Sequence, residues 1–262
     1  MKRGNSIGKS DISALVEQYY SEFASKHKLQ ILADRDPSTW ASTEAMRKAM
    51  TKRIAVQKEI FQNYFLNRAG KVLDVGCGFG RQALILARTG YNVIACDICQ
   101  SFLDIGKAVA DREGLSIDFM RMDIKELQFQ DNYFDYVLLL DTIEHIPENG
   151  RGPVFSEVSR VLKKEGLVVI SIPHQQQSHT INRATNIIKS YYKRPRSFLR
   201  ALGRILISRI IKLIKPGRMK ITEEHPFPLP AVNEIAEYLA DDFNIINQRN
   251  TEATSFLVAQ RK

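Results

Sequence analysis

Cysteine is scarce in this sequence of 262 residues, which contains only Cys77, Cys96 and Cys99. Three cysteines are too few for a disulfide-stabilised scaffold, and their odd number suits a reducing compartment, so we expect a cytoplasmic protein. Long apolar runs are also missing. No uncharged stretch is long enough to span a bilayer, and no apolar core of the signal-peptide kind follows the charged start at 1–5. The composition, 44% hydrophobic and 26% charged, is typical of a soluble globular chain.

Acidic residues are missing from one long segment. From His174 to Lys220 the chain has twelve Lys or Arg and no Asp or Glu, although the formal charge of the whole chain is only +9. The basic charge therefore belongs to an insert, at about 174–222, and the rest of the chain is slightly acidic. Within it, Pro195–Lys215 places apolar residues on one half of a helical wheel and most basic residues on the other. This pattern fits a helix on an anionic membrane, a helix packed on the domain, or a phosphate-binding arm for RNA.

A short apolar strand, Lys71–Val75, runs into a turn rich in glycine. The turn reads Gly76-Cys77-Gly78-Phe79-Gly80. A helix is expected after it at 81–88, and a strand, a glycine turn and a helix in this order form a nucleotide-sized pocket. The dinucleotide fingerprint needs Gly or Ala where Arg81 stands, and the carboxylate of Asp74 repels phosphate. A ligand that carries a cationic group is therefore favoured.

Apolar segments alternate with helical ones along most of the chain. The expected strands are 71–75, 91–96, 116–121, 134–140, 167–172, 243–249 and 255–260, and the expected helices are 11–29, 44–66, 81–88, 101–113, 154–163 and 231–240. Strands so continuously apolar are usually buried on both faces of a parallel sheet that helices cover. The last two strands follow the basic insert, and we expect them to form an antiparallel hairpin that closes the sheet.

Acidic residues stand at the expected carboxyl ends of three successive strands, at Asp74, Asp97 and Asp123. That edge is where an open α/β sheet binds its ligand. Asp97 lies 21 residues after Gly76, a spacing at which a carboxylate can accept both hydroxyls of a ribose. A single Asp is more often a helix cap or a turn former. Three of them in register favour a nucleoside site.

From Lys71 to Pro173 these motifs resemble the class I S-adenosylmethionine (SAM) dependent methyltransferases, in which the same strand and an acidic residue precede Gly-x-Gly-x-Gly. The resemblance implies a Rossmann-like α/β fold: a mostly parallel sheet with an antiparallel last strand, N-terminal helices and a helical insert after strand five. The segment 140–146 is similar to the part that follows strand four in enzymes of ubiquinone and menaquinone biosynthesis.

The resemblance also assigns the cofactor contacts. Asp97 takes the ribose, Asp123 and the backbone N–H of Ile124 take the adenine, and Ile98 and Phe102 sandwich the ring. Gly76, Cys77 and Gly78 line the methionine part, and a main-chain carbonyl near Leu140 holds its amine. Asp74 and Gly80 are also expected among the cofactor-binding residues.

We expect two regions, an N-terminal helical lid at 1–66 and a methyltransferase domain at 67–262. The tyrosine-rich helix expected at 11–29 resembles the first helix of many small-molecule methyltransferases, which folds over the cofactor and would bring Tyr20 to it. The same spacing of apolar residues also describes an ordinary amphipathic helix that packs on the core.

A general base is needed only if the acceptor must lose a proton. His145, just past strand four, is the leading candidate, and a structural role at the start of a helix is its alternative. His174 and His225 are candidates at the substrate. Asp141 and Glu144 could hold a divalent ion together with His145, but further ligands are missing, and the pair Cys96 and Cys99 lacks a second pair, so we predict no metal.

These features predict a methyltransferase that moves the methyl group of SAM, by in-line displacement, to an O or C nucleophile of a small, hydrophobic or lipid-like acceptor. Peripheral contact with an anionic membrane is expected from the insert. The alternatives are an RNA methyltransferase that uses the basic insert and a non-catalytic SAM-binding scaffold. Nucleic acid is the less favoured partner, because the place after strand four reads Leu140-Asp141-Thr142-Ile143 and not the Asn/Asp-Pro-Pro-aromatic motif of base-amino methyltransferases.

Overall fold

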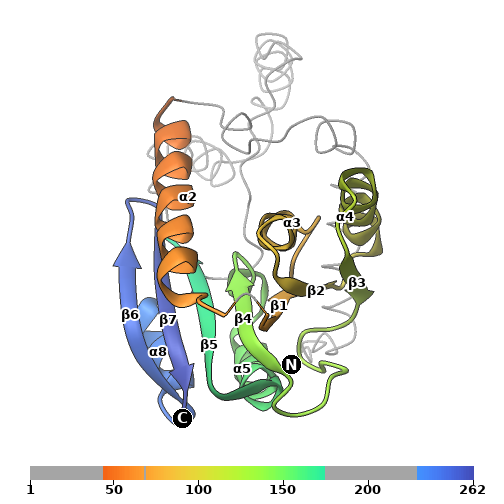
Figure 1. The fold of residues 1–262 in the computed structure, drawn as a ribbon. Coiled ribbons are helices and arrows are strands. Elements are labelled where there is room, and N and C mark those ends of the chain that lie inside the picture. The colour runs from red at the N-terminus through yellow and green to blue at the C-terminus, as the bar shows by residue number, and fades with distance from the viewer. Residues whose placement is uncertain (1–43, 68, 175–228) are drawn as a thin grey trace, which may run out of the picture. The chain divides into compact units, whose positions relative to one another are not determined.

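The computed structural model describes residues 44–67, 69–174 and 229–262, and these form a seven-stranded sheet with helices on both faces (Figure 1). The strands are β1 (Lys71–Val75), β2 (Asn92–Asp97), β3 (Ile117–Arg121), β4 (Phe134–Leu140), β5 (Leu162–Pro173), β6 (Phe243–Asn250) and β7 (Thr254–Arg261). The helices are α2 (Glu44–Tyr64), α3 (Arg81–Arg88), α4 (Gln100–Glu113), the short 3-10 helix η2 (Ile143–His145), α5 (Glu148–Val161) and α8 (Val232–Leu239).

The strand order across the sheet is β3-β2-β1-β4-β5-β7-β6. The first five of these strands pair in parallel, whereas β7 runs antiparallel to both of its neighbours, β5 and β6. The predicted mostly parallel, Rossmann-like sheet with an antiparallel last strand is therefore confirmed. The direction in which strands are added to the sheet reverses between β1 and β4. The carboxyl ends of β1, β2 and β4 lie at or next to this switch point, where such a sheet binds its ligand.

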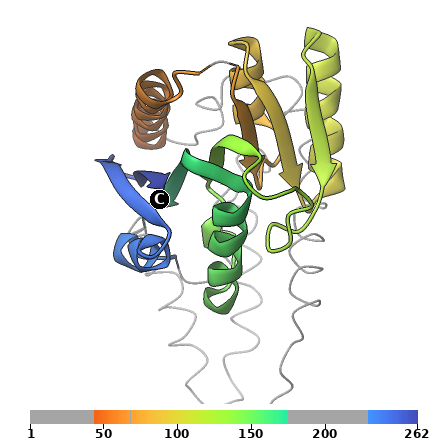
Figure 2. The ribbon, with the colours of Figure 1, turned by 60° about the horizontal axis from the view of Figure 1, so that its bottom comes forward.

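Two apolar clusters fill the space on the two faces of the sheet. On one face α5 and α8 pack against β4, β5 and β7 through residues such as Phe155, Val158 and Ile235 (Figure 2). On the other face α2 and α3 pack against β1, β2 and β4 through residues such as Ile60 and Leu86. A parallel sheet covered on both faces explains why its strands read as continuous apolar runs.

Helix α2 is joined to the sheet at its C-terminal end. Ile60 and Phe65 are 2% and 3% exposed, and the ring of Phe65 stacks on Tyr136 of β4 with a centroid distance of 4.3 Å. Burial of such a side chain stabilises the fold by about 1.5–3 kcal/mol. Polar contacts reach the antiparallel strands as well, because Glu59 forms an ion pair at 2.6 Å with Arg249 of β6.

The beginning of α5 differs from the predicted 154–163. The helix starts at Glu148, and its first turns include two glycines and Pro153, residues that disfavour a helix interior. A tertiary contact outweighs this local preference: Arg151 is 2% exposed, forms an ion pair with Glu234 of α8, and donates a hydrogen bond at 3.1 Å to the carbonyl of Ile146. We correct the predicted helix accordingly.

The following strand also differs from its predicted bounds of 167–172. β5 begins at Leu162 and contains an irregularity before Leu167, with Glu165 at φ 62° and a register shift against β4. The remaining elements agree with the prediction to within about two residues, as is usual at element ends.

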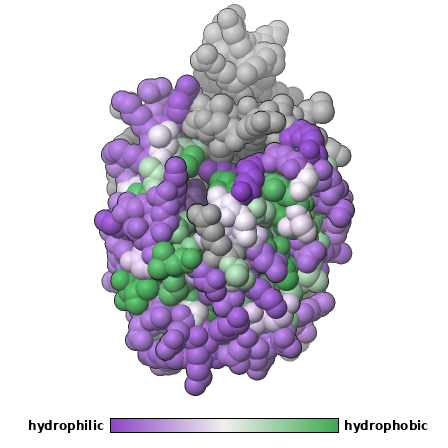
Figure 3. Space-filling model, in the orientation of Figure 1, coloured by the Kyte–Doolittle hydropathy of each residue, from purple (hydrophilic) through white to green (hydrophobic). Residues whose placement is uncertain are grey.

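Hydrophilic side chains cover most of the face drawn in Figure 3, and a hydrophobic area lies over β6. Among the described residues the exposed large apolar side chains are Leu66, Ile245 and Ile246. None of the helices that the structure describes is long and apolar enough to cross a membrane. The predicted first helix at 11–29 and the basic insert, apart from His174, lie outside the described residues.

Candidate functional site

The turn after β1 is held by backbone hydrogen bonds. The N–H of Cys77 donates to the carbonyl of Cys96 in β2 at 2.9 Å, and the N–H of Gly80 donates back to the carbonyl of Cys77 at 2.9 Å. The turn is thereby attached to the neighbouring strand before α3 begins. The first N–H groups of α3 and the main chain of the turn lie together at the carboxyl edge of the sheet (Figure 1).

Two glycines of this turn differ in what surrounds them. Both Gly76 and Gly78 have positive φ, 66° and 54°. A Cβ added at Gly76 would lie 2.3 Å from Cγ2 of Thr142, so the side-chain position there is already filled by protein. Apart from its own chain neighbours, a Cβ added at Gly78 would meet none of the described residues within 4 Å. The main chain at Gly78 is therefore open to a ligand, and only a residue without a side chain leaves it open.

Asp97 lies at the end of β2, directly beside this open main chain. Its Oδ2 accepts a hydrogen bond from the N–H of Gly78 at 2.8 Å, and its Oδ1 accepts one from the N–H of Cys99 at 2.8 Å. Burial raises its pKa, an effect that the N–H groups of Cys99, Gly78 and Ile98 oppose. Each carboxylate oxygen can accept more than one hydrogen bond, so the group fits the predicted role at two ribose hydroxyls.

Asp74 is 3% exposed, within β1. Its Oδ2 accepts a hydrogen bond from the N–H of Ala83 in α3 at 3.1 Å, which fixes the helix against the strand. Burial raises the pKa of Asp74 to about 7, with the hydrogen bond from Ala83 acting against this and the charge of Asp97 adding to it. A buried carboxyl with this pKa ionises readily once a cation approaches, as a cationic ligand requires.

The three cysteines are free thiols. Burial, together with the nearby charges of Asp74 and Asp97, raises the pKa values of Cys77 and Cys96, so both thiols stay protonated at neutral pH. Among the residues that the structure describes, no group of three or more His, Cys, Asp or Glu side chains is placed to hold a metal ion.

The residues predicted to contact adenine gather after β2 and β3. The N–H of Met122 donates to the carbonyl of Asp97 at 3.1 Å, which holds the two strand ends together. Oδ1 of Asp123 accepts a hydrogen bond from the N–H of Lys125 at 3.0 Å, and its Oδ2 forms an ion pair with Nζ of the same lysine at 3.2 Å. Asp123 therefore shapes its own turn, and its role at adenine stays a prediction.

The two candidates to sandwich the ring differ in exposure. Phe102 is only 7% exposed and meets the ring of Phe79 edge-on, with a centroid distance of 6.3 Å. Ile98 is half-buried, and its carbonyl accepts a hydrogen bond from Nε of Arg121 at 3.0 Å. Ile124, whose backbone N–H is the predicted contact to the ring, is 7% exposed.

The end of β4 carries a second polar network. The hydroxyl of Thr142 lies 3.0 Å from the carbonyl of Leu140 and 3.2 Å from that of Val75, so it joins the ends of β4 and β1. Asp141 adopts φ 52°, and its N–H donates to Oγ of Ser171 at 2.8 Å, while that hydroxyl donates to Oδ1 of Asp141 at 2.9 Å. These hydrogen bonds fix the position of the main chain around the carbonyl of Leu140, which is the predicted contact to the methionine amine.

Comparison with known proteins agrees with this geometry. Residues 73–170 match the sequence profile of a family described as a methyltransferase domain. The matched segment begins in β1 and ends in β5, so it contains the glycine turn, Asp97, Asp123 and Leu140. Over these residues the chain is therefore similar to a methyltransferase domain.

Several proteins are similar to parts or all of this chain. The ubiquinone biosynthesis O-methyltransferase of Rickettsia felis is 36% identical over 113 residues, which is 43% of this chain and 42% of that protein. Among solved structures, magnesium protoporphyrin IX methyltransferase from Synechocystis with bound SAM superposes with a TM-score of 0.64 over 100% of both chains, at 15% identity. A SAM-dependent methyltransferase from Methanosarcina mazei has a TM-score of 0.56 at 24% identity, over 77% of this chain and 96% of that one.

The chain spans about two fifths of the length of the relatives it matches in sequence. The two solved structures are matched over a larger part of this chain, and at their low identity this similarity shows the fold of the methyltransferase domain.

Arg53 is a polar residue at this edge that sequence reasoning missed. It belongs to α2, yet its guanidinium forms an ion pair with Oδ2 of Asp141, just beyond β4. The next residue towards the N-terminus, Lys52, forms an ion pair at 2.5 Å with Glu252 in the turn between β6 and β7. No motif in the sequence marks Arg53, because its partner is 88 residues away.

The histidine candidates fall in different places. The backbone N–H of His145, in η2, donates to the carbonyl of Thr142 at 3.0 Å, and both roles of its side chain stay predictions. His174 follows β5 at the same edge of the methyltransferase domain, and its ring Nε2 lies 2.7 Å from Oγ of Ser255. Tyr20 and His225 lie outside the described residues.

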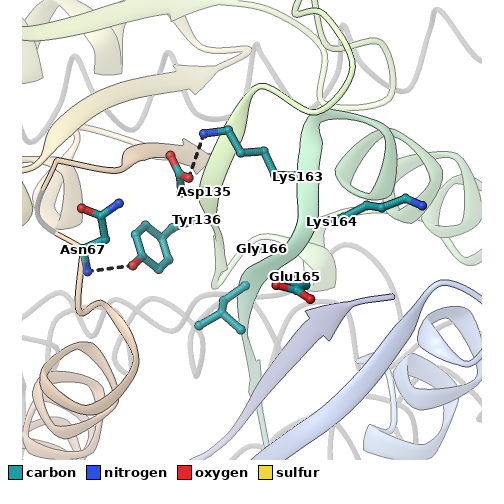
Figure 4. A pocket seen from close by; sticks show the side chains of 8 residues that line it. Asn67, Asp135, Tyr136, Lys163, Lys164, Glu165 and Gly166 are labelled. Carbon is teal, nitrogen blue, oxygen red and sulfur yellow. Dashed lines mark hydrogen bonds and ion pairs between the residues drawn. The ribbon is translucent and has the colours of Figure 1, made fainter.

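A cavity of 180 Å³ lies at the opposite, amino end of β4 and β5 (Figure 4). The side chains of Asp135 and Lys163 point toward each other there, with a distance of 2.8 Å between Oδ1 and Nζ, while Lys164 points away. The hydroxyl of Tyr136 accepts a hydrogen bond from the N–H of Asn67 at 3.0 Å. These polar groups have partners within the domain, so we do not assign the active site to this cavity.

Proposed function

We propose that the protein is an enzyme that transfers a methyl group from SAM to a small, hydrophobic acceptor. The observation that carries the proposal is the open main chain at Gly78 with the carboxylate of Asp97 hydrogen-bonded beside it, within a methyltransferase domain. Asp74, ready to ionise near neutral pH, supports a cationic ligand at the same edge. Together these residues fit SAM, which carries a ribose and a sulfonium.

Bound SAM supplies a methyl group on a positively charged sulfur, which a nucleophile displaces in line. The contribution of the protein is to bind and to orient. Asp97 would hold the ribose, Asp123 and Ile124 the adenine, and the carbonyl of Leu140 the methionine amine. Fixed orientation of this kind can supply roughly 7–11 kcal/mol of the barrier to reaction.

Oxygen is the acceptor atom that we favour over carbon. The relatives in Rickettsia are named ubiquinone biosynthesis O-methyltransferases, and the match covers 43% of this chain. We extend to this chain the class of acceptor that the name suggests, a hydroxyl group on a hydrophobic, quinone-like ring. The amphipathic pattern predicted for Pro195–Lys215 would serve an acceptor that resides in a membrane.

The experiment is methyl transfer from labelled SAM into a host-cell extract, followed by separation into lipid, RNA, protein and small-molecule fractions. The proposal predicts label in the lipid or small-molecule fraction, in a methoxy group, and its loss with Asp97→Ala. Label in RNA would overturn the acceptor class and make the basic insert a phosphate-binding arm. Absence of label from every fraction, with SAM still bound, would favour a non-catalytic scaffold.

A further inference from the structure

A chain of three polar side chains joins the end of β5 to the hairpin of β6 and β7. The ring Nε2 of His174 lies 2.7 Å from Oγ of Ser255, and the hydroxyl of Ser255 donates to Oδ1 of Asn250 at 2.9 Å. Ser255 is 2% exposed and His174 is half-buried, whereas Asn250 is exposed. The main chain holds the histidine too, because its N–H donates to the carbonyl of Ala253 at 2.7 Å.

This chain of hydrogen bonds favours one tautomer of His174. A serine hydroxyl has one hydrogen, and the hydroxyl of Ser255 donates its hydrogen to Oδ1 of Asn250. The same Oδ1 lies 3.4 Å from Nε2 of Gln248. Oγ of Ser255 must then accept from the imidazole, so Nε2 is the donor. In a neutral imidazole the other nitrogen, Nδ1, keeps its lone pair and is the basic atom.

His174 also lies where an acceptor has to bind. The cofactor candidates occupy the carboxyl ends of β2, β1 and β4, the last of them being Leu140. Leu140 pairs with Ser171 of β5, three residues before His174. An acceptor beyond the methionine end therefore meets the carboxyl end of β5. Charged groups described near this end include Arg53 of α2 with Asp141, just after β4, Lys52 of α2 with Glu252 of the β6–β7 turn, and the buried Glu144 of η2.

We propose that His174 is the general base that deprotonates a hydroxyl acceptor, and that Ser255 and Asn250 position it. This inference rests on the proposed function. The proton of the acceptor hydroxyl passes to Nδ1, the oxygen forms a bond to the methyl carbon, and the carbon–sulfur bond breaks with its electron pair left on sulfur. The positive charge of the sulfonium is thereby replaced by that of the imidazolium, which returns its proton to water.

The tautomer of His174 is measurable without any acceptor, by NMR of protein with ¹⁵N-labelled histidine. The inference predicts an unprotonated Nδ1 and a protonated Nε2 for His174, whose signal is assigned as the one that is missing from the spectrum of the His174→Asn variant. Ser255→Ala should mix the two tautomers, whereas Ser156→Ala, a change at an exposed serine of α5, should not. The opposite tautomer in the unaltered protein would overturn the proposal.

The kinetic test uses His174→Gln, because the amide of glutamine can still donate to Ser255 but offers no basic nitrogen. With host-cell extract as acceptor, the methyl-transfer rate should fall by roughly 10²–10⁴-fold, the usual contribution of a general base. SAM affinity should stay unchanged, because His174 is assigned to the acceptor and not to the cofactor. Ser255→Ala should lower the rate less, and Ser156→Ala should leave it unchanged.

The outcomes separate the two proposals. If the unaltered protein transfers no methyl group, the proposed function fails. If it does so and His174→Gln is equally active, the assignment of His174 fails while the function stands. A large loss in His145→Gln with none in His174→Gln would transfer the role of base to His145.

Discussion

Gly76 and Thr142 are packed so closely that a methyl group on Gly76 would lie 2.3 Å from Cγ2 of Thr142. Real Cβ atoms do not approach other atoms to this distance, so the loop after β4 can pack here only because residue 76 has no side chain. The hydroxyl of the same threonine lies within hydrogen-bond distance of the carbonyls of Val75 and Leu140. A packing contact therefore aligns the two strand ends between which the cofactor is expected to bind.

Gly76→Ala should destabilise the fold more than Gly90→Ala. Both glycines have positive φ, but an added Cβ at Gly90 meets no atom within 4 Å, so Gly90→Ala isolates the cost of the backbone angle. That cost is about 1–2 kcal/mol. Gly76→Ala should lose a further 1–3 kcal/mol or so through overpacking. Denaturant unfolding of both variants measures the difference.

Thr142→Ala should restore part of the stability that Gly76→Ala loses. The change removes Cγ2 and Oγ1, so in the double variant the added methyl group at position 76 meets only Cβ of residue 142, at 3.1 Å. We expect a coupling energy of roughly 0.5–3 kcal/mol between the two changes, measured by denaturant unfolding of the single and double variants. Additive effects would mean that the contact does not cause the loss.

Gly78→Ala should fold almost like Gly90→Ala and yet lose affinity for SAM. Neither added Cβ meets protein, and both positions have positive φ. At Gly78, however, the methyl group would occupy the main-chain surface that we assign to the ligand. We expect SAM to bind at least tenfold more weakly, about 1.4 kcal/mol, by calorimetry. Equal affinity in the Gly78→Ala and Gly90→Ala proteins would remove this turn from the cofactor site.

The buried carboxyl of Asp74 should make stability depend on pH. Its pKa is raised to about 7 in the folded protein, so from about pH 4 to 7 the folded state retains a proton that the unfolded chain has released. The free energy of unfolding should therefore fall as pH rises through this window, by about 4 kcal/mol in total. Asp74→Asn should lack this component.

Denaturant unfolding at several pH values across this window measures the component as the difference between the unaltered protein and Asp74→Asn. Asp118→Asn is the matched control, because Asp118 is an exposed residue of β3. A pH dependence that is the same in all three proteins would show that Asp74 ionises normally in the fold.

Local patterns predicted the part of the site that lies on consecutive residues. The apolar run of β1, the glycines after it and the start of α3 at Arg81 agree with the sequence prediction, as does β4 from Phe134 to Leu140. Apolar runs and glycines determine the conformation of the residues next to them, so a few consecutive residues are enough to predict these elements. The carboxylates at the strand ends were predictable because each lies within a recognisable apolar strand or just after one.

Contacts between distant segments were not predictable in this way. The ion pair between Arg53 and Asp141 joins residues that are 88 positions apart in the sequence. The hydrogen bonds of Thr142 with Val75 and of Asp141 with Ser171 join residues 67 and 30 positions apart. Each depends on the order of strands in the finished sheet and leaves no local pattern. The early start of α5 has the same origin, since Arg151 is held by Glu234 of α8 and not by neighbours that favour a helix.

We expect SAM to bind at the carboxyl ends of β1 and β2 with its ribose on Asp97, and calorimetric titration with SAM measures this binding. The account predicts one binding site in the unaltered protein, an affinity at least tenfold lower in Asp97→Ala, and no change in Asp118→Ala. Thermal unfolding confirms that each variant is folded. Equal affinity in a folded Asp97→Ala protein, or no binding of SAM by the unaltered protein, would contradict the account.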